Sequence, residues 1–164
     1  MILRALPLLL SACILLQGCG SQERSREREG EASPSSATIL DTLIQLRDAS
    51  GRTLSLQGSP GRILSLVPSG SETLLAIGAG GRLVGRTDFD EVQGVAHLPS
   101  VGGGLHPNLE AILALDPHLV IRVADDTDTR TPLRLDEMGI PHFSIDPRSI
   151  ESVRGIIRDL GIIT

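Results

Sequence analysis

Short runs of consecutive apolar residues alternate with helix-like segments along residues 62–164, and this alternation constrains the fold more than any other feature. The apolar runs lie at 62–67, 83–86, 119–123 and 140–145. Strands that are apolar on both faces are typical of a parallel sheet covered by helices on both sides. The segments with helical patterns or helix-start signals lie at 73–77, 108–115, 131–138 and 150–160. The sequence therefore predicts an α/β fold with a mainly parallel sheet.

Three local signals in residues 43–72 add detail to this prediction. Apolar residues at 43–46 and 54–56 flank a turn sequence that ends in Gly51, which predicts an N-terminal β-hairpin. Pro68 cannot donate to a sheet and is expected to end the first parallel strand. Ser69 and Glu72 have the capping-box spacing, so Ser69 is predicted to cap the helix that follows.

The first 38 residues are predicted to lie outside the folded lobe. Residues 1–19 contain one arginine, then an apolar stretch, and end in Leu-Gln-Gly-Cys19, which resembles the lipobox of a bacterial lipoprotein signal. Cys13 gives a second match after a shorter apolar stretch, and a plain signal peptide is the remaining alternative. Residues 20–38 have the composition of a disordered tether. We expect an exported lobe at 39–164, on the periplasmic or cell-surface face, attached to the membrane through lipid on Cys19.

Composition and motif spacing argue against several classes of function. The net charge is −5, and the chain has two Phe, no Tyr and no Trp, which is unlike a nucleic-acid surface. The glycines at 78–81 do not form a dinucleotide fingerprint, and Ser69 lacks the flanking glycines of a nucleophile elbow. The four histidines lack metal-site spacing, and both cysteines lie in the leader. The chain is therefore predicted to be no enzyme and to hold no cofactor or metal, with a hydrolase or dehydrogenase ranked last.

One loop is the main candidate for a ligand site. Ligands of open α/β sheets bind outside the carboxyl ends of the strands. The loops expected at those ends are 68–71, 87–107, 124–129 and 146–149. The second of them is about 20 residues long, and loops of that length in a compact domain are usually functional. It carries Phe89, His97, three glycines at 102–104, and His106.

The lobe resembles a known family in several stretches. Residues 62–69 (RILSLVPS), 72–78 (ETLLAIG) and 83–85 (LVG) resemble the opening of the ABC-importer substrate-binding proteins for vitamin B12 and ferric siderophores. Residues 107–121 (PNLEAILALDPHLVI) match the family's most specific stretch, which usually has Asp where this chain has His118. The later segments that also match are 135–141 and 149–153.

This resemblance implies a fold and a function. The family has two Rossmann-like, three-layer lobes joined by a long bridging helix, and the ligand lies between the lobes. The chain resembles the N-terminal lobe, so the second lobe and the bridging helix are expected to be missing. The implied role is a non-enzymatic carrier that delivers a metal-chelate nutrient to an ABC permease, with vitamin B12 slightly ahead of a ferric siderophore or haem. A lipid-anchored signalling or scaffold protein that has kept the lobe is the alternative.

The resemblance also suggests roles for particular residues. Phe89 aligns with an aromatic residue that stacks on vitamin B12, although core packing is its alternative, and Gly104 stands where that branch has tryptophan. His106 would approach the cobalt of a corrinoid. Arg86 and Arg122 lie near strand ends, where guanidinium groups would pair with carboxylates of a siderophore or haem.

Two further residues complete the candidate site. Ser69, in the first strand-to-helix loop, joins the candidate ligand-binding residues Arg86, Phe89, His106 and Arg122. Glu110 matches the acidic residue with which this lobe docks onto arginines of the permease. A glutamate in the first turn of a helix also stabilises the helix dipole, so that purely structural role stays open for Glu110.

Overall fold

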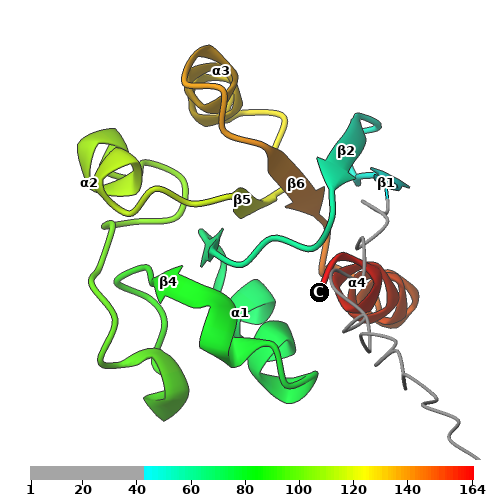
Figure 1. The fold of residues 1–164 in the computed structure, drawn as a ribbon, viewed down its shortest axis with the longest axis horizontal. Coiled ribbons are helices and arrows are strands. Elements are labelled where there is room, and N and C mark those ends of the chain that lie inside the picture. Colours follow the sequence, from blue (N-terminus) through cyan, green and yellow to red (C-terminus); the bar gives the residue numbers. More distant parts are fainter. Residues whose placement is uncertain (1–42) are drawn as a thin grey trace, which may run out of the picture. The chain divides into compact units, whose positions relative to one another are not determined.

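Helices and strands alternate along the chain in the computed structural model, which describes residues 43–164 (Figure 1). The elements in chain order are β1 (Leu43–Arg47), β2 (Thr53–Gln57), β3 (Ile63–Ser65), α1 (Pro68–Ala76), the 3-10 turn η1 (Gly80–Arg82), β4 (Leu83–Gly85), the 3-10 turn η2 (Gln93–Val95), α2 (Leu109–Ala114), β5 (Leu119–Val123), α3 (Arg130–Glu137), β6 (His142–Ile145) and α4 (Ile150–Ile163). The predicted α/β fold with an N-terminal hairpin is confirmed. Among the described residues no helix has the length and apolar character needed to cross a bilayer.

The four later strands form a parallel sheet in the order β4-β3-β5-β6, while β1 and β2 pair antiparallel as a separate hairpin. The chain runs from β3 outward to β4 and then returns past β3 to β5. The direction of winding therefore reverses between β3 and β5. In open α/β sheets the crevice at the carboxyl ends of two such strands is where ligands bind.

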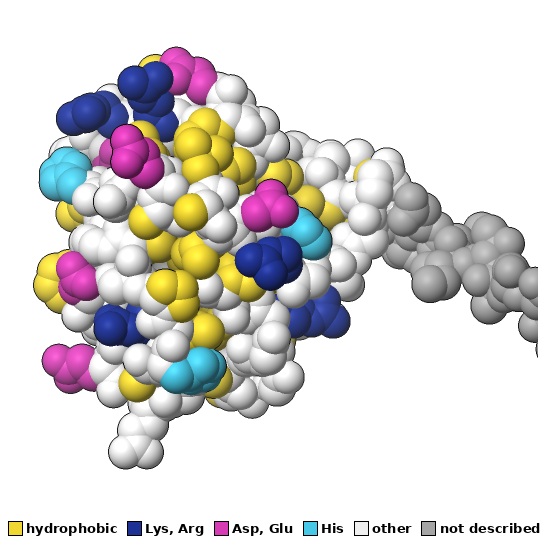
Figure 2. Space-filling view, turned by 60° about the vertical axis from the view of Figure 1, so that its left-hand side comes forward, with side chains coloured by type: hydrophobic (Ala, Val, Ile, Leu, Met, Phe, Trp, Pro, Cys, Tyr) yellow, Lys and Arg dark blue, Asp and Glu magenta, His cyan; other side chains and the backbone are white. Residues whose placement is uncertain are grey.

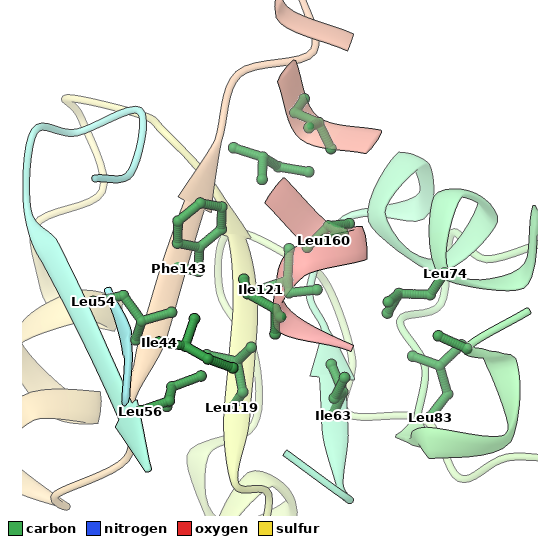
Figure 3. Packing of buried hydrophobic residues seen from close by; sticks show 14 of the residues in the cluster. Ile44, Leu54, Leu56, Ile63, Leu74, Leu83, Leu119, Ile121, Phe143 and Leu160 are labelled. Atoms are coloured by element: carbon green, nitrogen blue, oxygen red, sulfur yellow. The ribbon is translucent and has the colours of Figure 1, made fainter. Parts of the chain in front are cut away.

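Helices cover both faces of this sheet, with α1 and α4 on one face and α2 and α3 on the other (Figure 1). Ile121 and Phe143 of the sheet meet Leu160 of α4 in the larger core, which also takes in the hairpin (Figure 3). Val120, the neighbour of Ile121, faces the opposite way into a smaller core under α2 and α3. The first four residues of β5 are thus all buried, which explains why the strand reads as a continuous apolar run.

Asp48, in the turn between β1 and β2, attaches the hairpin to β6. Its buried carboxylate accepts hydrogen bonds from the backbone N–H groups of Ser50, Arg52 and Ser144 at 3.0, 2.9 and 3.1 Å. The N–H of Ala49 also donates to the Ser144 carbonyl. Burial alone would raise the pKa of Asp48, but the hydrogen bonds from Ser50, Arg52 and Ser144 together lower it. The carboxylate is therefore ionised in the fold and ties the turn to the sheet.

The start of α1 differs from the sequence prediction. The helix begins at Pro68, a position where the missing N–H of proline leaves no hydrogen bond unmade. Ser69 lies inside the first turn, and Val67 occupies the N-cap without a side-chain hydrogen bond, so the predicted capping role of Ser69 is wrong. In α2 the N-cap is a side chain, because Oδ1 of Asn108 accepts hydrogen bonds from the N–H groups of Glu110 and Ala111.

Candidate functional site

A mostly apolar cavity of about 620 Å³ opens at the carboxyl ends of β3 and β5, where the winding of the sheet reverses. Three consecutive residues, 66–68, follow β3 and form one part of its lining. Val123 at the end of β5 and Asp125 beyond it form another part. The remaining lining residues come from the long loop after β4 and are Phe89, Gly103, Gly104, Leu105 and His106. The site thus lies where the rule for open α/β sheets places ligands.

Phe89 lines this cavity with a largely exposed ring. The residue is 67 % exposed, so the alternative that Phe89 packs in the core is wrong. A Cβ atom placed on Gly103 would lie 3.7 Å from Cε2 of the ring, so one edge of the ring lies beside backbone that has no side chain. An exposed aromatic ring next to an apolar hollow offers a surface that the flat apolar face of a ligand can cover.

Gly104 passes so close to the end of β3 that no side chain fits there. A Cβ atom at this position would collide with the carbonyl oxygen of Leu66, a backbone atom that cannot move aside as a side chain can. Glycine is therefore the residue that lets the loop close over β3. A tryptophan at this position would require a different path of the backbone.

Hydrogen bonds within the long loop hold its ends in place. Asp90 accepts hydrogen bonds from the backbone N–H and the hydroxyl of Thr87, both at 2.7 Å, and both residues are buried. The hydroxyl of Ser100 donates to Asp88 and accepts from the N–H of Gly102. These hydrogen bonds give the loop a defined conformation, in which it forms part of the cavity wall.

A second, polar cavity of about 570 Å³ shares Val123 and Asp125 with the apolar one. Arg122 lines it and is only 6 % exposed. Its Nε donates to Nδ1 of His142 at 3.3 Å, and its Nη1 donates to the carbonyl of Val123 at 3.2 Å. Among residues 43–164 no carboxylate forms an ion pair with Arg122. Burial lowers the pKa of this guanidinium, whereas the negative charges of Asp48, Asp128 and Asp136 raise it. The lining of this cavity also includes the carboxylates of Asp125, Asp126 and Asp146.

His142 lies between Arg122 and Asp136, and its contacts with them determine which ring nitrogen carries the proton. Because Nε of Arg122 can only donate, Nδ1 of His142 must accept, and the proton of the neutral ring therefore lies on Nε2. Nε2 is 3.2 Å from Oδ1 of Asp136, which also receives a hydrogen bond from Arg52 at 2.8 Å. Burial, followed by the positive charges of Arg52 and Arg122, lowers the pKa of His142 below 6.5. The ring is therefore neutral near pH 7.

The two arginines singled out in the sequence, Arg86 and Arg122, lie apart in the structure. Strand β3 lies between β4 and β5, so the backbone at Arg86, after β4, is about two strand spacings or roughly 10 Å from β5. Nη1 of Arg86 donates to the carbonyl of Thr87, and Arg86 lines neither cavity. Arg122 alone of the two faces a cavity.

Of the other residues predicted to be functional that the structure describes, one lines a cavity and the rest do not. His106 is exposed and lines the apolar cavity. Ser69 is half-buried in α1, and its hydroxyl has no hydrogen-bond partner among the described residues. Glu110 is exposed in the first turn of α2, outside both cavities. Cys19, together with the predicted signal at 1–19 and tether at 20–38, lies outside the described residues.

Sequence reasoning missed the network behind Arg122. Arg52 and Asp136 are 84 residues apart, and Arg122 and His142 are 20 apart, so no local spacing signals their contacts. The sign available in the sequence was His142 in the apolar run at 140–145, since a histidine that is buried in a strand needs polar partners. In the part of the chain that the structure describes, no group of three or more His, Cys, Asp or Glu side chains is arranged to hold a metal ion.

A doubly wound lobe with an open apolar hollow at its switch point is typical of a small-molecule binding protein. The family described as periplasmic binding protein matches residues 63–164, and the chain belongs to this family. The resemblance read from the sequence is thereby confirmed. The family consists of binding proteins, which agrees with the prediction that the chain is no enzyme.

Two curated relatives and one solved structure show how far the similarity extends. An uncharacterized ABC transporter substrate-binding lipoprotein of Bacillus subtilis is 29 % identical over 69 % of this chain and 34 % of its own length. A cobalamin-binding protein of Halobacterium salinarum is 31 % identical over 71 % of this chain and 31 % of its own. The crystal structure of the haem-binding protein HmuT superposes with a TM-score of 0.61 at 28 % identity, covering 76 % of this chain and 43 % of HmuT. The chain thus spans about a third of the length of the curated relatives it matches.

Proposed function

We propose that the chain is a substrate-binding lobe of an ABC importer for a large, flat metal chelate. The observation that carries this proposal is the apolar cavity at the switch point, with the exposed ring of Phe89 in its lining. A planar macrocycle would cover Phe89 on one face, and its polar edge would reach the adjoining cavity that Arg122 lines. Relatives named as cobalamin-binding and haem-binding proteins support this ligand class.

The ligand test compares three chelates on one protein. The chain is titrated with cyanocobalamin, haem and a ferric siderophore, and the dissociation constant of each is measured by calorimetry. Phe89→Ala should weaken macrocycle binding roughly tenfold, because an aromatic stacking contact is removed along with its apolar area. Leu113→Ala is the matched control, since Leu113 is also exposed, at 51 %, but lies on α2 away from both cavities. Equal effects of the two substitutions, or no binding of any chelate, would refute the proposal.

In this proposal, Glu110 is the residue through which the lobe contacts the permease. Its carboxylate is exposed in the first turn of α2, lines neither cavity and forms no ion pair within residues 43–164. An arginine of a permease could therefore reach it without displacing another group. In a two-lobed version of the protein, Glu110→Gln should reduce uptake while the dissociation constant of the ligand stays unchanged. If the substitution also weakened ligand binding, Glu110 would belong to the ligand site, and its assignment to a permease contact would be wrong.

Export and membrane attachment belong to the same proposal. The lipobox ending in Cys19 supplies the attachment point, and the Bacillus subtilis relative is itself named a lipoprotein. The lobe would then face the outside of a bacterial membrane, where an importer collects its substrate.

A further inference from the structure

A small basic pocket adjoins the apolar cavity, and we propose that it binds a carboxylate of the same ligand. This inference rests on the proposed function, because it assumes that a macrocycle occupies the apolar cavity. The pocket has a volume of about 90 Å³, far below the 620 Å³ of the apolar cavity, so it suits a small group such as a carboxylate but not a ring system. Its lining residues are His106, Pro107, Leu109, Arg130, Thr131 and Arg134.

The geometry of α3 brings the two arginines of this pocket together. Arg130 and Arg134 are four residues apart and therefore lie on one face of the helix. The hydroxyl of Thr131 donates to the carbonyl of Leu105 at 3.3 Å, which holds the first turn of α3 against the long loop. His106, the next residue of that loop, lines both the basic pocket and the apolar cavity. A group attached to a ligand in the apolar cavity therefore has a short path to the arginines.

The charged side chains that line the pocket are arginines. The described residues that line it include two guanidinium groups and no carboxylate. Arg134 forms an ion pair with Glu137 at 2.6 Å, whereas Arg130 forms none within residues 43–164. Guanidinium groups bind carboxylates through two parallel hydrogen bonds, so a carboxylate is the chemical complement of Arg130.

This pocket favours one class of chelate over another. A porphyrin such as haem carries carboxylates on short flexible arms, whereas the peripheral groups of a corrinoid are mainly uncharged amides. Figure 2, which turns the side of the lobe carrying α2 forward, shows apolar side chains lying directly among arginine, acidic and histidine side chains. The basic pocket therefore places a carboxylated porphyrin ahead of vitamin B12, which the sequence analysis ranks first.

Metal-free protoporphyrin and its dimethyl ester provide the test, with binding followed by porphyrin fluorescence. Removing the metal prevents His106 from binding through iron, and the ester removes the carboxylate charges. The diacid should bind about tenfold more tightly than the ester. Arg130→Gln should abolish that difference and leave the ester unaffected, while Arg130→Lys should keep part of it. Arg154→Gln, at an exposed arginine of α4, is the control and should change neither affinity.

The outcomes separate this inference from the function on which it rests. If the diacid and the ester bind equally well, or if Arg130→Gln weakens both equally, the carboxylate site is refuted while the macrocycle site stands. Binding of cyanocobalamin without either porphyrin would likewise refute the carboxylate site alone. If Arg130→Gln impairs uptake but not porphyrin affinity, the arginine belongs to a permease interface and the inference is wrong. If no macrocycle binds, both proposals fail.

Discussion

Gly104 is the residue on which the shape of the apolar cavity depends most. Its backbone lies against the carbonyl oxygen of Leu66, so the cavity wall and the end of β3 are in direct contact. The sequence shows three consecutive glycines in a long loop, which predicts an unusual backbone but not which glycine is required. The requirement for glycine at position 104 comes from its close approach to Leu66, almost forty residues earlier in the chain, and this approach is visible only in the folded structure.

Gly104→Ala should therefore destabilise the lobe by about 1–3 kcal/mol, because the added methyl group forces the backbone apart. Gly155→Ala is the control. Gly155 lies in α4 with open space where a methyl group would point, and alanine there should stabilise the lobe by about 0.5–1 kcal/mol. Urea unfolding of the two variants and the parent measures both effects, and a destabilised Gly155→Ala beside an unaffected Gly104→Ala would contradict the close approach.

His142 makes the stability of the lobe depend on pH. Its pKa in the folded state is lowered below the ordinary 6.5 by burial and by the two neighbouring arginines. Between these two pKa values the unfolded chain binds more protons than the folded one, so the free energy of unfolding must fall as the pH falls. The contribution is fully present above pH 6.5 and is lost as the pH drops through the folded pKa.

The measurement is the free energy of unfolding at a series of pH values from 7.5 downwards, for the parent and for His142→Gln. The variant has no imidazole to protonate and should show a flatter profile below pH 6.5. Identical profiles would show that His142 is not the buried neutral group that its contacts with Arg122 and Asp136 require.

The elements of the lobe could be predicted where their burial leaves a pattern in the sequence. β5 was predicted with its observed bounds, because its alternate residues enter two different cores and the whole strand reads as apolar. The start of α1 was predicted wrongly, because Ser69 has the spacing of a capping residue but lies inside the helix. The docking of the hairpin on β6 could not be predicted, since it depends on one carboxylate that meets a strand 96 residues away.

Asp48→Ala should loosen this docking and cost about 2–4 kcal/mol of stability, because three backbone N–H groups lose a charged acceptor. Asp126→Ala removes an exposed carboxylate from the loop after β5 and should change the stability by less than about 0.5 kcal/mol. Thermal unfolding compares the two variants with the parent. Similar melting temperatures for both would mean that the hairpin is held by its apolar side chains alone.

At the scale of the whole molecule, the resemblance in sequence identified the family and the lobe, and the position of the site follows from the strand order. What the sequence left open was which polar residues line the two cavities. Arg86 and Arg122 look equivalent as arginines at strand ends, yet Arg122 lines the polar cavity and Arg86 lines neither of the two cavities described above. Arg130 and Arg134 carry no signal of their own and become a candidate site only where α3 meets the long loop.

The predicted lipoprotein signal at 1–19 leads to a prediction for the intact chain in the cell. Cys19→Ser should release the protein from the membrane fraction, because acyl chains contribute roughly 0.8 kcal/mol per buried CH₂ and the substitution removes their attachment point. Cys13→Ser is the matched control and should leave the protein attached. Release by Cys13→Ser instead of Cys19→Ser, measured by immunoblotting of membrane and soluble fractions, would reassign the lipobox.

NMR mapping of a bound macrocycle locates the ligand site on the lobe. Metal-free protoporphyrin should shift the backbone amide signals of Gly103, Gly104 and Leu105, which line the apolar cavity. The amides of Gly155 and Gly161 in α4 should stay in place, because that helix lines neither the apolar cavity nor the polar one beside it. Shifts concentrated on α4, with the three loop amides unchanged, would contradict a ligand site at the carboxyl ends of β3 and β5.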